Sequence, residues 1–136
     1  MGYGLIADAI VAVHVAYVSY VVIGQLLIWL GLALRWRWVR NPWFRWTHLI
    51  AIVIVGGEAI LDIECPLTRW ERQFRTLAGQ TVSGESFVGR LMHNLIFVDW
   101  SPAVINGLHV AFAVVVLATF ALAPPRRRMI LAEPRL

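Results

Sequence analysis

Four histidines are the first residues in this chain with types and spacing that suit chemistry, because each lies in a separate apolar segment: His14, His48, His93 and His109. Ionisable groups are costly inside a membrane, so each is a functional candidate. If the four segments are helices that cross in alternating directions, a rise of about 1.5 Å per residue sets the depth of each ring. His14 and His93 then lie about 10 to 13 Å below one surface, and His48 and His109 about 8 to 9 Å below the other.

Two pairs of imidazoles at two depths are the arrangement that axial ligation of b-type haem requires. We therefore expect His14, His93, His48 and His109 as cofactor-binding residues for one or two haems b, with His14 and His93 as the better pair of iron ligands. Two other interpretations stay open. The rings either make interhelical hydrogen bonds with neighbouring Ser, Gln and Asn side chains, or serve another metal or a proton relay.

A second polar group follows the second apolar segment. Its members are Glu58, Asp62, Glu64, Cys65, Glu71, Arg75 and Arg90. One hypothesis is an ion-pair network that joins residues 64 to 78 to the helices. The other is a proton or quinone site formed by Glu58, Asp62 and His93. Cys65 is either a reactive or lipidated thiol at the interface or a small packed side chain.

The amino-acid composition indicates the environment of these residues. Hydrophobic residues make up 60% of the 136 residues and the mean hydropathy is +0.70, which predicts an integral membrane protein in contact with the lipid bilayer. The formal charge of +4 comes from arginine alone, clustered at the ends of apolar runs as positive membrane flanks are, so a nucleic-acid partner is not expected. A single cysteine excludes an internal disulfide.

The apolar pattern predicts an all-α membrane fold, a four-helix transmembrane bundle in a single membrane domain over residues 1–136. The expected spans are 5–34, 43–63, a short 86–100 and 103–122, with an amphipathic interfacial helix over 66–78 between the second and third spans. Residues 86–100 are short for a hydrocarbon core of about 30 Å, so a three-span alternative remains. In that alternative the arginine-rich loop before residue 42 and the C-terminal tail share one side.

Three stretches resemble a bacterial membrane family known as domain of unknown function 2784: HVAYVSYVVIG at 14–24, HLIAIVIVGGEAILDIECPLTRWERQFR at 48–75 and SFVGRLMHNLIF at 86–97. The most specific element is CPLT at 65–68, followed by Glu71 and Arg75. The family pattern has histidines that match His14, His48 and His93. The resemblance implies a multi-pass protein of the bacterial inner membrane and conveys no activity.

Two functions of different classes follow from these observations. In the first, the protein is a small b-type haem protein or subunit that transfers electrons in the membrane, with a quinone as a candidate partner. In the second, it is a structural or accessory subunit of a larger membrane complex, and its histidines, Glu58 and arginines form a polar network. The sequence shows no nucleophile-base arrangement and no phosphate-binding glycine loop, so it gives no support for a hydrolase or a kinase.

Overall fold

The computed structural model describes residues 2–82, 84 and 87–126, and every regular element in this part of the chain is helical. The start of the expected third span at residue 86 and the tail beyond residue 126 lie outside the described residues. The elements are α1 (Gly2–Ala33), η1 (Trp38–Arg40), α2 (Pro42–Ile60), α3 (Pro66–Leu77), α4 (Phe87–Ile96) and α5 (Pro102–Leu122).

A residue with left-handed backbone follows each of four helices; Phe97 follows α4 with φ 53°, and the other three share one capping pattern. Arg35 follows α1 with φ 59°, Asp62 follows α2 with φ 54° and Gly79 follows α3 with φ 71°. In each case the next amide donates to a carbonyl five residues earlier, which satisfies a carbonyl at the helix end. The turn at Asp62 explains why α2 ends at Ile60, three residues before the expected end at 63.

Side-chain caps start two of the helices, α2 and α5. Asn41 accepts a hydrogen bond from the Trp43 amide at 2.9 Å and Pro42 is the first residue of α2. Ser101 caps α5 in the same way through the Val104 amide. Proline at the first helical position needs no amide partner, so both helices start where the sequence places an Asn-Pro or Ser-Pro pair.

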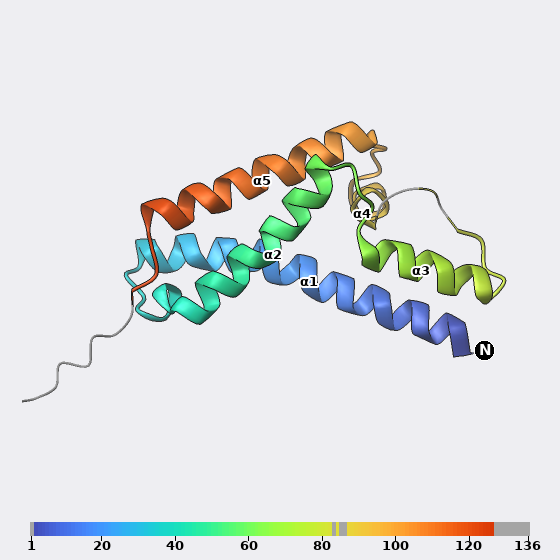
Figure 1. Ribbon diagram of the computed structural model, residues 1–136, viewed down its shortest axis with the longest axis horizontal. Coiled ribbons are helices and arrows are strands. Elements are labelled where there is room, and N and C mark those ends of the chain that lie inside the picture. The colour runs from blue at the N-terminus through green and yellow to red at the C-terminus, as the bar shows by residue number, and fades with distance from the viewer. Residues whose placement is uncertain (1, 83, 85–86, 127–136) are drawn as a thin grey trace, which may run out of the picture.

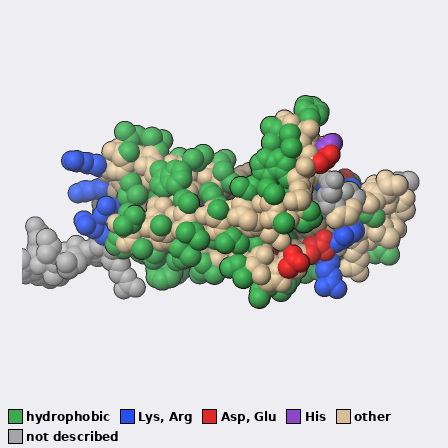
Figure 2. Space-filling view, turned by 90° about the horizontal axis from the view of Figure 1, so that it is seen from above, with side chains coloured by type: hydrophobic (Ala, Val, Ile, Leu, Met, Phe, Trp, Pro, Cys, Tyr) green, Lys and Arg blue, Asp and Glu red, His purple; other side chains and the backbone are tan. Residues whose placement is uncertain are grey.

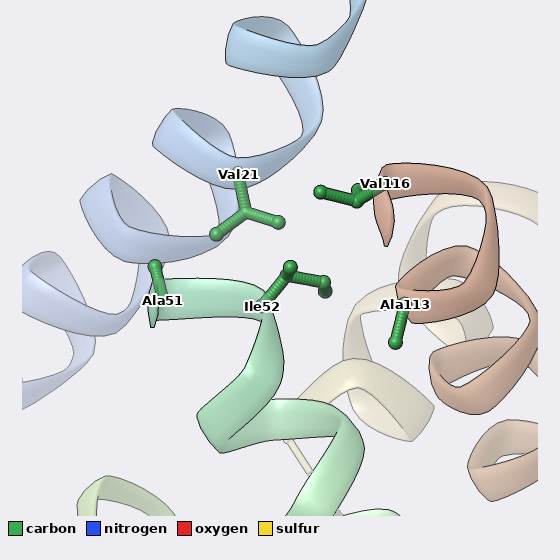
Figure 3. Close-up of a cluster of buried hydrophobic side chains, with 5 residues drawn as sticks. All are labelled: Val21, Ala51, Ile52, Ala113 and Val116. Carbon is green, nitrogen blue, oxygen red and sulfur yellow. The ribbon is translucent and has the colours of Figure 1, made fainter. Parts of the chain in front are cut away.

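Two packing units lie at the two ends of α1 (Figure 1). At its C-terminal half, α2 and α5 pack on each other and on α1. At its N-terminal half, α3 packs antiparallel to α1 with α4 beside it. The buried core lies in the first unit, where side chains from all three helices point toward one another: Val21, Ala51, Ile52, Ala113 and Val116 (Figure 3). Gly56 of α2 allows the close approach of α5, because an added Cβ would lie 2.8 Å from Cβ of Ala113.

Among the described residues, α1, α2 and α5 are long and apolar enough to cross a membrane. The fourth expected span is not confirmed. α4 has 10 residues, which gives a length of about 15 Å, half of a hydrocarbon core. The Arg126 amide donates to the Arg40 carbonyl at 3.1 Å, so the end of α5 returns to the loop between α1 and α2, as the three-span alternative requires.

Charged side chains collect at the two ends of the molecule (Figure 2). One end shows arginine without acidic neighbours, and the other shows acidic and basic side chains together. The surface between these ends is largely hydrophobic, with large apolar side chains exposed along α1, α2 and α5.

Candidate functional site

The structure does not bring the histidines together in the expected pairs. His48 is 1% exposed, and its Nε2 lies 2.8 Å from the Val21 carbonyl oxygen in the packed unit of α1, α2 and α5. His93 is exposed on α4, and its Nδ1 lies 2.5 Å from Asp99 Oδ1. His14 and His109 instead line one cavity and are close enough to interact electrostatically. The prediction of these pairs assumed a fourth span, whereas α4 has 10 residues, about half of the length that a span needs.

The close packing around His48 leaves no room for a macrocycle there. An added Cβ on Gly24 would lie 2.8 Å from the His48 ring, and one on Gly31 would lie 2.3 Å from a methyl group of Val39. The two glycines are therefore contact points for a side chain of α2 and a side chain of η1.

The cavity that His14 and His109 share has a volume of about 630 Å³. It lies between the middle of α1, the end of α2, α4 and the first half of α5. Most of its lining is apolar, contributed by Val18, Val21, Ile52, Ala59, Leu91, Met92, Ile105 and Leu108 among others. A volume of this size, with an apolar wall and few polar groups, is typical of sites for small molecules.

His14 is one of two buried polar residues described on this wall, with 5% of its surface exposed against 3% for Thr68. Its ring stacks on Phe87 of α4 with 4.0 Å between centroids, and Nε2 lies 4.0 Å from Cys65 Sγ. Its Nδ1 is buried and has no hydrogen-bond partner among the described residues. Because a buried polar nitrogen without a partner costs free energy, this atom is a natural contact for a bound molecule.

Cys65 lies where α2 gives way to α3, with one side toward His14 and another toward Glu58. Burial raises the pKa of the thiol, and the nearby Glu58 raises it further, while the Leu67 and Thr68 amides lower it. Cys65 is therefore held as a neutral thiol near neutral pH, which is the state of an unreactive cysteine.

Four carboxylates line the same cavity, namely Glu58, Asp62, Glu64 and Asp99. Three of them have a hydrogen-bond or ion-pair partner among the described residues. Glu64 pairs with Arg72, Asp99 pairs with His93, and Asp62 accepts a hydrogen bond from Asn106 Nδ2 at 3.0 Å. Glu58 has the neutral thiol of Cys65 and the phenol of Tyr17 as neighbouring polar groups, and it has no cationic partner among the described contacts.

The remaining members of the predicted polar group form a separate ion-pair cluster beside the cavity. Glu71 is 3% exposed and accepts from Arg75 Nε at 2.9 Å and from Arg90 Nη2 at 2.6 Å. Arg75 also contacts Asp8 at 3.2 Å and Gln80 at 3.0 Å, and its bond to Glu71 raises the pKa of its guanidinium. These contacts connect α3 to α1 and α4.

Two residues of this arrangement were missed by sequence reasoning. Asp8 of α1 completes the cluster around Arg75, and no spacing rule connects positions 67 residues apart. Arg45 is 3% exposed, and its Nη2 donates to the Thr119 and Ala123 carbonyls at 3.1 and 2.7 Å, which satisfies the end of α5. The sequence analysis interpreted the arginines at the ends of apolar runs as positive membrane flanks, and this interpretation does not predict the role of Arg45.

In the part of the chain that the structure describes, the fold is all-helical, with three helices able to cross a membrane and a partly open, mainly apolar cavity at their acidic end. Residues 4–125 match the family described as Protein of Unknown function (DUF2784), and the chain belongs to this family. No curated protein and no solved structure matches the chain.

Proposed function

We propose that the chain is a three-span membrane protein that binds one small, largely apolar molecule in the cavity around His14. The observation that carries this proposal is the cavity itself, about 630 Å³ and mainly apolar, with a buried imidazole on its wall whose Nδ1 lacks a partner. Apolar walls supply affinity through burial, and a few polar groups orient the ligand.

In this proposal α1, α2 and α5 cross the cytoplasmic membrane of a bacterium. The loop with Arg35, Arg37 and Arg40 lies on the cytoplasmic side together with Arg126, because arginine concentrates on that side. α3 lies at the opposite interface. Its polar residues Thr68 and Glu71 face the protein, while Trp70 and Leu77 are exposed, as in a helix that turns its apolar side to lipid.

The histidines of this cavity suit haem b, but its charged residues do not. His14 and His109 line the cavity and could offer two imidazoles, whereas His48 and His93 are engaged elsewhere. The two propionates of haem need arginine or other donors, and the described lining holds four carboxylates and no arginine. The residues present therefore do not fit haem b, and an uncharged or cationic ligand is favoured.

A cavity-filling substitution tests the proposal. The protein is purified in lipid nanodiscs, and bound small molecules are extracted and quantified by mass spectrometry. We expect about one molecule per chain in the wild type and less than about one tenth of that in Ala59→Phe, because Ala59 lines the cavity. Ala12→Phe is the matched control, since Ala12 is exposed on α1. Equal occupancy in the two variants, or none in the wild type, would refute the proposal.

An optical spectrum of the same samples tests the haem hypothesis directly. Protein made with a full haem supply is expected to be colourless. A Soret band that shifts on dithionite reduction and disappears in His14→Ala would make haem the ligand despite the charges of the lining.

An accessory role in a larger complex is the second candidate. It is favoured by the Glu71 cluster, which fixes α3 and α4 on α1, and by the extent of apolar surface. Native gel electrophoresis of mildly solubilised membranes checks it, because an accessory subunit migrates with its complex and a separate binding protein migrates alone.

A further inference from the structure

The charges around the cavity are strongly segregated. It is lined by four of the chain's eight acidic residues and, in the part of the chain that the structure describes, by none of its twelve arginines. Arg72 and His93 pair with two of these carboxylates, which leaves Glu58 and Asp62 without a cationic partner among the described residues, so the wall disfavours anionic groups and favours cations. The cavity therefore selects a ligand by charge as well as by apolar surface.

Glu58 is the carboxylate best placed to receive a cation. Asp62, Glu64 and Asp99 have partners in Asn106, Arg72 and His93. Glu58 lies on α2 between the apolar wall and the neutral thiol of Cys65, and no described arginine or histidine pairs with it. A carboxylate at the edge of an apolar cavity gains most from a counter-ion that is itself weakly hydrated.

Aromatic rings complete the surroundings of a cation. Tyr17, Phe87, Trp100 and Phe112 line the cavity, so rings from α1, α4, the loop before α5 and the middle of α5 contribute to one wall. The faces of aromatic rings attract ammonium-type cations, an effect that grows when water is excluded. The buried His14, with its unpartnered Nδ1, adds a polar contact that is independent of the acidic residues.

We propose that the cavity binds a largely apolar organic cation, an alkyl- or aryl-substituted ammonium or phosphonium, with Glu58 as its counter-charge and the aromatic side chains around it. This inference rests on the proposed function and specifies the ligand class of the same site. It excludes fatty acids, phospholipid phosphates and other anions as the ligand.

Tetraphenylphosphonium is the probe for this inference. Binding of the labelled cation to the full chain is measured by equilibrium dialysis in phosphatidylcholine nanodiscs, against empty nanodiscs. We expect saturable binding of about one cation per chain, and about a tenfold or greater loss of affinity in Glu58→Gln, where the charge is removed and the shape is kept. Asp8→Asn is the control, because Asp8 is an exposed carboxylate outside the cavity.

Competition experiments on the wild type test the same inference without a variant, so a misfolded variant cannot affect their result. The neutral triphenylphosphine oxide and the anion triphenylacetate are offered as competitors to the wild type, and neither is expected to displace the cation. Displacement by the neutral compound at equal concentration, or unchanged affinity in Glu58→Gln, would overturn the inference and leave the proposed function intact. Loss of any saturable binding, together with no extracted molecule from the wild type, would remove both.

Discussion

His14 and His48 are both buried on the inner side of their helices, yet their surroundings are opposite. His48 is enclosed by α1 and α2, with a carbonyl partner at 2.8 Å and a glycine where a Cβ would not fit. His14 lies on the wall of a cavity, stacked on one ring, with one nitrogen unpartnered. We call these the dense site around His48 and the hollow site around His14; the Val21 carbonyl that His48 contacts lies about two helical turns along α1 from His14. Burial alone does not distinguish a histidine that packs between helices from one that lines a cavity. Whether the ring nitrogens have hydrogen-bond partners distinguishes the two better.

The largest expected effect is on stability at His48. His48→Ala removes a ring that is 1% exposed and its hydrogen bond to Val21, which we expect to cost about 3 kcal/mol because the surrounding helices cannot close the gap. His14→Ala removes a ring that already borders empty space, and we expect about 1 kcal/mol. Thermal unfolding in detergent micelles, followed by circular dichroism, measures both. Equal losses would contradict the distinction between the dense and the hollow site.

The hollow site also depends on the ion pairs that hold α4. Glu71→Gln leaves Arg75 and Arg90 without their shared carboxylate, and we expect a loss of about 2 kcal/mol, reduced from a fully buried pair because each arginine side chain is 24% exposed. Glu64→Gln is the matched control. It breaks the ion pair with Arg72, in which both side chains are more than a third solvent-accessible. That control is expected to change stability by less than about 1 kcal/mol. A similar loss in both variants would show that the Glu71 cluster has no special weight.

Substitutions of glycine by alanine on α1 and α2 test the close packing, and we expect smaller changes in stability from them. Gly31→Ala places a Cβ 2.3 Å from a methyl group of Val39, so overpacking exceeds the gain in helix propensity and stability falls by about 1 kcal/mol. Val39→Ala in the same chain should restore part of that loss. Gly57→Ala, where an added Cβ meets nothing within 4 Å, should be stabilising by up to about 1 kcal/mol. The same melting experiment measures all three, and a destabilised Gly57→Ala would argue against the packing explanation.

The sequence predicts the helices well where the signal is local. Asn41 and Pro42 predict the start of α2, Gly79 predicts the end of α3, and long apolar runs predict α1 and α5. What failed depends on tertiary geometry. The direction of α4 decides whether His93 can face His14, and no local rule fixes the direction of a ten-residue helix after a polar loop. The candidate site was predicted in part, because Glu58, Asp62, Glu64, Cys65, His14 and His109 share one cavity while the charge of its wall appears only when the helices are assembled.

The smallest expected effect concerns the thiol of Cys65 in the hollow site. Its pKa is raised above the ordinary value of 9.0 by burial and by Glu58, so the folded protein favours the neutral thiol. The sign follows from this direction: the contribution to stability is complete below the ordinary pKa and is lost as the pH rises through the raised pKa of the folded state. Alkylation by a small maleimide should therefore be slow at pH 7 and should increase about tenfold per pH unit, continuing beyond pH 9 in the folded protein. In Glu58→Gln the whole profile should move to lower pH, and denatured protein should level off near the ordinary pKa. A folded wild type that reacts as the denatured chain does would show that Cys65 is open to water and that the cavity wall is not closed around it.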